Sequence, residues 1–228
     1  MKVTRVGRQI LLGAAGWLAL QGVAAELTQV QLRDSDGKPV ANAVVEFDAQ
    51  TVDSMYPVDG EYRMDQKDYQ FTPRVLIVPP GASVQFPNSD ESRHHVYSFS
   101  APKPFELQLY AGNQAPPVLF DTQGVVAIGC NIHDKMSAHI YVTDAPMAQV
   151  SDGQGQVTFP RYQNGTEGDL RIWHPLLNAP VVLTPEQWSA LSGGMLTVDL
   201  PMTVPIESDD KAGSSLRDRL KSFKSNGN

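Results

Sequence analysis

Short runs in which apolar and polar residues alternate recur along most of the chain, separated by turns that contain Gly or Pro. Val30 and Leu32 alternate with polar neighbours in one run, and Val84 and Phe86 do so in another. Successive side chains of a strand point to opposite faces, so this pattern predicts half-buried β-strands. One short helix is expected at 184–187, where Thr-Pro-Glu-Gln supplies an N-cap, a first-turn Pro and a capping Gln. The chain is therefore predicted to be all-β.

Three segments depart from this pattern. Residues 1–25 have a positively charged start, an apolar run and small residues up to Ala25, which is the order of a secretory signal peptide. The apolar run at 10–23 is shorter than the roughly 20 residues that span a bilayer, so cleavage after Ala25 is favoured over a retained membrane anchor. Residues 51–70 are polar and irregular and are predicted to be a linking segment, and residues 206–228 are predicted to be a flexible tail.

The processed chain is expected to be an exported, periplasmic protein with no stable membrane span. Loss of the first 25 residues removes three cations and no acid, which takes the formal charge from −7 to −10. A net negative charge disfavours nucleic acid as a partner, because faces that bind nucleic acid are usually basic. Cys130 is the sole cysteine, so no internal disulfide can form. A lone exported thiol is either buried and inert or bound to a metal.

A candidate metal site lies in the sequence GCNIHDKM, in which Cys130, His133 and Met136 are spaced C-x2-H-x2-M between two predicted strands. Thiolate, imidazole and thioether ligands suit copper, and a Cys with two His and a weak axial Met defines the blue-copper electron-transfer site. The second imidazole would come from the pair His94–His95, which begins a distant predicted strand. A C-x2-H pair alone is a weak signal, and zinc with a Met ligand would be unusual. The strand–loop–strand setting favours copper.

Residues 71–143 resemble the cupredoxins, the amicyanin- and plastocyanin-like blue copper proteins. Two motifs carry the resemblance: the opening strands FTPRVLIVPPGASVQFPNSD and the closing ligand loop GVVAIGCNIHDKMSAHIYV. The runs RHHVYSFS and GCNIHDKM are also similar to those of bacterial cupredoxin-like methylamine utilization proteins. The resemblance implies a Greek-key β-sandwich at residues 53–146, one mononuclear type 1 copper site and periplasmic electron transfer.

The resemblance favours His94 as the fourth ligand, since it follows Phe86 by eight positions and Asn88 by six, which is the spacing found in amicyanin. His95 then occupies a position at which these proteins carry an Asn that helps to organise the ligand loop. Strand alternation argues the other way, because His95 shares a face with the two larger aromatic residues that follow it. The predicted ligands are His94, Cys130, His133 and Met136, with His95 as the alternative to the first.

The segments on either side of the copper domain resemble two parts of one further fold. The sequence VQLRDSDGKPVANAVVEF is similar to the first strands of carboxypeptidase-regulatory-like, transthyretin-like β-sandwiches, and AQVSDGQGQVTFPRYQNGTEGDLRIWH to the last strands. Insertion at a loop is tolerated because chain ends lie close together. We therefore predict that the cupredoxin domain, 53–146, is inserted into a discontinuous sandwich of residues 26–52 and 147–205.

The predicted function is one-electron transfer by a periplasmic type 1 copper protein. The sequence contains no second metal motif, phosphate-binding loop or serine-nucleophile motif, so an enzyme is not expected. A periplasmic cytochrome c or dehydrogenase is the expected class of partner. The alternatives are a copper-binding accessory or storage protein without a redox partner, and a binding module that keeps the fold without using copper. His139 is expected to be a surface residue or to support the ligands from behind, and His174 is expected to be a packing residue.

Overall fold

The computed structural model describes residues 27–47, 56–133, 135–160, 168–189 and 195–205. These residues form strands β1 to β17 and one short helix, which confirms the all-β prediction. None of the described helical residues belongs to a helix long and apolar enough to cross a membrane. The predicted signal peptide and the predicted tail both lie outside the described residues.

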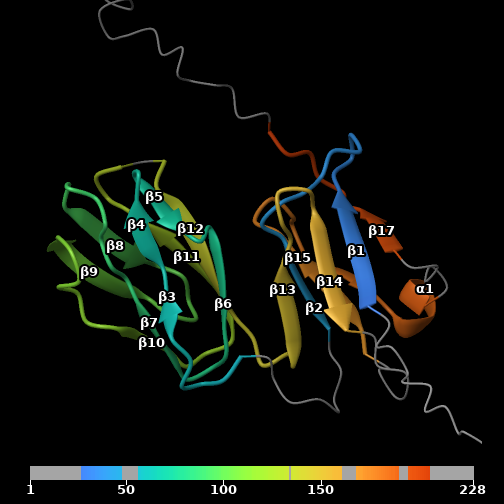
Figure 1. Ribbon diagram of the computed structural model, residues 1–228, viewed down its shortest axis with the longest axis horizontal. Coiled ribbons are helices and arrows are strands. Elements are labelled where there is room, and N and C mark those ends of the chain that lie inside the picture. Colours follow the sequence, from blue (N-terminus) through green and yellow to red (C-terminus); the bar gives the residue numbers. More distant parts are fainter. Residues whose placement is uncertain (1–26, 48–55, 134, 161–167, 190–194, 206–228) are drawn as a thin grey trace, which may run out of the picture.

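One group of strands, on the left of Figure 1, forms a β-sandwich. The larger sheet has the order β6-β12-β11-β8-β9, the smaller sheet has the order β10-β7-β3, and β4 pairs with β5. Several strands that are neighbours in a sheet are not consecutive in the sequence, so the chain must cross between them. Such crossing connections are typical of a Greek-key sandwich. The bounds are β3 (Tyr62–Arg63), β4 (Asp65–Lys67), β5 (Gln70–Thr72), β6 (Val75–Val78), β7 (Ala82–Gln85), β8 (His94–Ser98), β9 (Phe105–Tyr110), β10 (Val118–Phe120), β11 (Gly124–Gly129) and β12 (Ser137–Val142).

The strands that precede and follow this group in the sequence pair with one another, on the right of Figure 1. Strand β1 lies between β14 and β17, and the second sheet has the order β13-β2-β15-β16. Strand β1 is antiparallel to β14 and parallel to β17. The bounds are β1 (Leu27–Arg33), β2 (Val44–Phe47), β13 (Met147–Val150), β14 (Gln156–Pro160), β15 (Leu170–Trp173), β16 (Val181–Leu183), α1 (Pro185–Ser189) and β17 (Met195–Asp199).

Helix α1 begins where the sequence predicts it. The Thr184 N–H donates to Gln187 Oε1 (2.9 Å), and the Trp188 N–H donates to the Thr184 carbonyl (3.1 Å). The first contact is half of a capping box, in which a side chain three residues after the N-cap satisfies the N-cap amide. Trp188 packs edge-on against Phe47. This short helix therefore covers part of the apolar core that lies between the sheet of β1 and the sheet of β2.

Strand β2 is buried on both faces, and this burial joins the two groups of strands. Val45 and Phe47 belong to the core between the sheets of β1 and β2. Val44 points the other way, into an apolar cluster with Ile77 of β6 and Tyr141 of β12. Because neighbouring residues of a strand face opposite sides, a strand buried at every position must be covered by structure on both sides.

A polar contact accompanies this apolar interface. Glu46 of β2 is 9% exposed and accepts a hydrogen bond from Thr143 Oγ1 (2.8 Å). Its other oxygen lies 3.1 Å from Arg171 Nε of β15. A buried carboxylate needs such partners, since leaving it unpaired costs several kcal/mol in water-excluded surroundings. The Thr143 contact therefore favours one fixed packing of β2 against the first sandwich, and the Arg171 contact ties β2 to its neighbour β15.

The predicted linking segment at 51–70 is wrong over its second half, which contains β3, β4 and the start of β5. Tyr62, Met64 and Gln66 all point inward, and the last two are 0% exposed. The alternation of apolar and polar residues is hard to recognise in this segment because Gln66, a polar residue, occupies an inward-facing position. Its amide nitrogen donates inside the sandwich to the Pro87 carbonyl and to the Tyr110 hydroxyl, whereas Oε1 has no partner among the described residues. A polar residue at a core position breaks the apolar–polar pattern without breaking the strand.

The turn between β13 and β14 provides a test of the fold. Gly155 has φ of 73°, and a Cβ at this position would lie 2.5 Å from the Leu32 carbonyl oxygen. We expect Gly155→Ala to lower the free energy of unfolding by at least about 2 kcal/mol, because the left-handed backbone alone costs an L-residue roughly 1–2 kcal/mol. Gly153→Ala in the same turn meets nothing within 4 Å and is the matched control. Equal urea midpoints for the two variants would contradict this packing.

Candidate metal centre

The C-x2-H-x2-M sequence forms the loop between β11 and β12. The two strands are antiparallel, with Gly129 opposite Ser137 as the last pair before the loop. The Cys130 N–H donates to the Met136 carbonyl (3.1 Å), and the Met136 N–H donates to the His133 carbonyl (2.9 Å). These two bonds close the loop on itself. They hold the thiol and the thioether at its base and place His133 near its tip.

The structure brings three of the four predicted ligands within contact distance. The distance from His94 Nδ1 to His133 Nδ1 is 3.2 Å, and Cys130 Sγ lies 3.9 Å from His94 Nδ1 and 3.5 Å from His133 Nδ1. His94 is 0% and Cys130 is 4% exposed. These three form the metal-ligand cluster found among the described residues. One thiol and two imidazoles thus converge in a buried place.

The spacing of these donors fits one metal ion. Ligand atoms bonded at about 2.0–2.3 Å to a common ion lie roughly 3.3–4 Å apart, and the three observed distances lie at or close to that range. A thiolate with two imidazoles is a set that copper and zinc both accept. The side chains are therefore already arranged to hold a metal with little movement.

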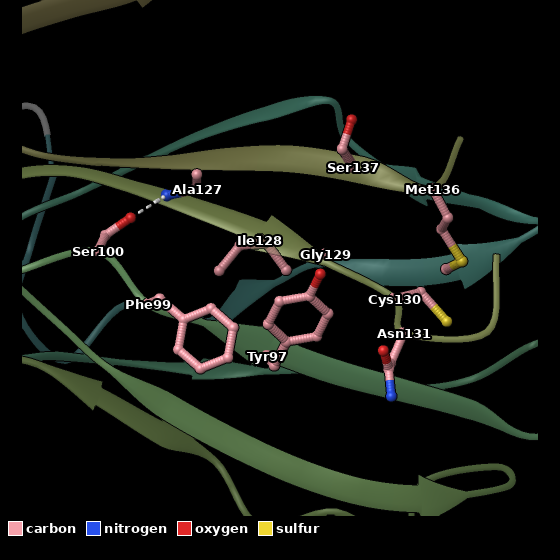
Figure 2. Close-up of a pocket in the computed structure, with 10 residues that line it drawn as sticks. All are labelled: Tyr97, Phe99, Ser100, Ala127, Ile128, Gly129, Cys130, Asn131, Met136 and Ser137. Carbon is pink, nitrogen blue, oxygen red and sulfur yellow. Dashed lines mark hydrogen bonds between the residues drawn. The ribbon is translucent and has the colours of Figure 1, made fainter. Parts of the chain in front are cut away.

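Met136 lies at the same end of the sandwich. Its side chain is 2% exposed and belongs to the same apolar core as Cys130. Figure 2 shows the Met136 thioether and the Cys130 thiol pointing toward the same end of β11 and β12. A thioether is a soft and weak ligand. The structure therefore places the Met136 side chain in the same core and at the same end of the sandwich as the Cys130 thiol.

Of the two neighbouring histidines, His94 rather than His95 faces Cys130. Residues 94, 96 and 98 of β8 are all buried on the core side. His95 lies on the outer face, where its Nε2 is 2.8 Å from Glu106 Oε1 and its ring contacts Tyr97 at a centroid distance of 5.6 Å. The alternation in the sequence correctly grouped His95 with the aromatic residues, but that group forms the outer face of the sheet.

A carboxylate orients the His94 ring, and sequence reasoning missed this role. Asp90 Oδ2 is 2.7 Å from His94 Nε2. Burial raises the pKa of the Asp90 carboxyl, but hydrogen bonds from the Tyr69 amide, His94 and the Asp68 amide outweigh it, so the pKa lies below its ordinary value. An ionised carboxylate only accepts, so Nε2 donates and the Nδ1 lone pair is directed to the metal cluster. In the sequence, Asp90 is only the last residue of the motif FTPRVLIVPPGASVQFPNSD, and the motif predicts no role for it.

Tyr69 is a second residue that sequence reasoning missed. It lies in the turn between β4 and β5, inside the segment that was predicted to be a linker. Its ring is 5.0 Å from the His133 ring and 5.8 Å from the His94 ring, centroid to centroid, and edge-on to both. An Asp-Tyr pair is not a typical hairpin turn, which usually contains Gly or Asn. The sequence therefore carries no local signal for its position.

A groove runs along the outer face of β8 and β11 next to the site (Figure 2). The rings of Tyr97 and Phe99 stand over this face in the figure, whereas the Cys130 thiol points away from them. Gly129 forms part of the groove, and a Cβ at this position would lie 3.0 Å from the Tyr97 ring. The absence of a side chain lets Tyr97 pack on the backbone of β11. Cys130 and Met136 also line the groove, so it reaches the end of the sandwich at which the donors lie.

The remaining described histidines lie at the packing interface between the strand groups. The His139 ring is 5.3 Å from the Trp173 ring, edge-on. Burial lowers the pKa of His139, and burial together with the nearby His139 lowers the pKa of His174. Both therefore favour the neutral form, as expected of packing residues.

Comparison with known proteins gives only partial likenesses. No family model and no curated protein matches the chain. A copper-containing nitrite reductase from Thermus scotoductus SA-01 is 24% identical over 37% of this chain and 23% of its own, with a TM-score of 0.35. A purple cupredoxin from Nitrosopumilus maritimus is 18% identical over 36% of this chain and 100% of its own, with a TM-score of 0.33. A reduced mutant of amicyanin is 20% identical over 45% of this chain and 99% of its own, with a TM-score of 0.35.

The two histidines can be distinguished by substitution. We expect His94→Ala to weaken metal binding on the order of 100-fold or more, because it removes a ligand from the buried cluster, where loss of supporting contacts alone costs 10–100-fold. His95→Ala is the matched control and should bind as the unaltered protein does. Titration with Co(II), followed by its thiolate charge-transfer absorption, measures both. Equal weakening by the two substitutions would contradict the assignment.

Proposed function

We propose that this protein is a one-electron carrier with a single type 1 copper site held by His94, Cys130 and His133, with Met136 as a weak fourth ligand. The observation that carries the proposal is the buried convergence of two imidazole nitrogens and one thiol, with no separation above 3.9 Å. Copper, when bound, supplies a reversible change between Cu(II) and Cu(I). The protein's own contribution is to hold the same ligands in place throughout.

The donor set favours copper over zinc. Zinc sites with one Cys and two His usually add a carboxylate, a further Cys or a water molecule. Here the side chain at the base of the loop is the thioether of Met136, which suits copper and not zinc. Burial of this residue at 2% exposure also keeps water from that side. The protein thereby supports both oxidation states with one set of ligands.

The surroundings of the site favour transfer of electrons without catalysis. With the three donors and the thioether as ligands, a bound copper ion would have no open position for a substrate. His133 is partly exposed near the loop tip, next to Ile132, which is 51% exposed. We propose that a periplasmic cytochrome c or dehydrogenase docks over this tip. An apolar contact beside an exposed imidazole ligand brings the two redox centres close together.

We also propose that the protein is exported to the periplasm and that its copper domain is inserted into a second β-sandwich. The order of residues in 1–25 is that of a secretory signal peptide, which supports a periplasmic location. The pairing of β1 and β2 with strands from 147–199 supports an inserted copper domain within a discontinuous sandwich of residues 26–52 and 147–205. The motifs RHHVYSFS and GCNIHDKM support a place among the cupredoxin-like methylamine utilization proteins.

Titration of the processed protein with Cu(II) tests the proposed function. We expect one equivalent to produce an intense visible thiolate-to-copper band, because a short bond to the Cys130 thiolate allows strong charge transfer. Cys130→Ser is the matched control and should bind copper, if at all, without the band. The unaltered protein should also lose reaction of Cys130 with iodoacetamide once copper is bound.

Two outcomes would contradict the proposal in different ways. Absence of the band, with Cys130 still alkylated after addition of copper, would leave a binding module that does not use the metal. A band with electron exchange too slow for turnover, and with easy loss of copper to a chelator, would favour an accessory or storage role. Rapid oxidation and reduction by a c-type cytochrome is the result that we expect of a carrier.

A further inference from the structure

The turn between β4 and β5 has an unusual backbone conformation beside the donor cluster. Asp68 and Tyr69 have φ of 54° and 58°. This left-handed region is populated by Gly and Asn in hairpin turns and is unfavourable for a bulky Tyr. Such conformations persist only where the surrounding structure enforces them, and they are concentrated at functional sites. Contacts outside the turn must therefore hold Tyr69 in place.

The Asp90 carboxylate provides these contacts. The Asp68 N–H donates to Oδ1 (2.7 Å), and the Tyr69 N–H donates to Oδ2 (3.1 Å). Two successive amides that converge on one anion form a backbone nest. The same carboxylate accepts from His94 Nε2 at 2.7 Å. One side chain thus fixes both the turn and the orientation of a predicted ligand.

Further hydrogen bonds fasten the hairpin to the loop that precedes β8. Ser89 Oγ donates to the Asp65 carboxylate oxygens at 3.0 and 2.8 Å, and the Ser89 N–H donates to the Gln66 carbonyl (2.9 Å). Gln66 is 0% exposed. Movement of the hairpin away from the site would break these bonds and expose a buried amide. The turn is thus a fixed part of the site and not a hinged lid.

The Tyr69 ring packs against both imidazoles and is itself partly exposed to solvent. It contacts His94 and His133 edge-on at centroid distances of 5.8 and 5.0 Å, and its hydroxyl is 3.1 Å from Ser92 Oγ. The residue is 53% exposed, whereas His94 beneath it is 0% exposed. A half-exposed ring that packs on a buried imidazole limits the contact of that imidazole with solvent.

We propose that the β4–β5 hairpin is a built-in cover of the metal site, and that Tyr69 is the positioning residue that holds His133 and shields the donors from water, small ligands and chelators. The proposal rests on the proposed function, since the shielded group is the bound metal. The ring contacts His133 edge-on and narrows entry to the edge of the site that it occupies. Removal of the Tyr69 ring should open this edge of the site to solvent, while all the proposed ligands remain present.

Tyr69→Ala and Tyr69→Phe test the cover in two ways. In the metal-free protein, Tyr69→Ala should increase the rate of Cys130 alkylation by iodoacetamide severalfold. In the copper-loaded protein, it should speed release of Cu(II) to EDTA on the order of tenfold, the lower end of the effect of groups that support metal ligands. Tyr69→Phe keeps the ring and should restore both rates. Leu176→Ala removes a 45% exposed apolar side chain in the second group of strands, away from the site, and should change neither.

The outcomes separate this inference from the proposed function. Unchanged rates in Tyr69→Ala, with copper bound as in the unaltered protein, would overturn the cover. Faster alkylation in Tyr69→Ala, in a protein that binds no copper at all, would support the cover and contradict the proposed function. Should Tyr69→Ala fail to fold, Tyr69→Gly removes the same ring at a backbone position that Gly prefers, and the same two rates decide.

Discussion

The position of strand β11 between β8 and β12 is the constraint on which the site depends. Pairing with β12 turns residues 130–136 into a closed loop, and pairing with β8 brings His94, 36 residues away in sequence, alongside Cys130. A slip of one residue in β8 would turn His95 inward in place of His94, and a slip in β11 would turn the position of Cys130 outward. The convergence of the thiol and the two imidazoles is thus a consequence of strand register. The apolar residues that line the inner faces enforce that register.

Asp90 fixes the loops around the site in addition to the strand that carries His94. Its carboxylate binds two backbone amides of the β4–β5 turn and the imidazole of His94. A ligand whose outer nitrogen is fixed in this way keeps its tautomer and its orientation before any metal arrives. In the proposed carrier this arrangement lets the ligands remain in place in both oxidation states. Preorganised groups of this kind lose little free energy to rearrangement.

The sequence predicted strands β8, β11 and β12, the helix after Thr184 and the loop at 130–136 because each has a local signal. The choice between His94 and His95 needed the structure, since alternation shows which residues share a face and not which face is buried. Gln66 concealed a strand by placing a polar group inside the core. Tyr69 has no local signal, because its left-handed conformation is imposed by the distant Asp90. Long-range hydrogen bonds of this kind are not encoded in any short motif.

X-ray absorption spectroscopy at the copper edge most directly tests whether the described cluster holds the metal. We predict one short copper–sulfur distance and scattering from two imidazole rings in the unaltered protein loaded with one equivalent of copper. The same measurement on Cys130→Ser should show no short sulfur distance. Copper surrounded by nitrogen and oxygen alone in the unaltered protein would contradict the assignment of Cys130, His94 and His133 as ligands.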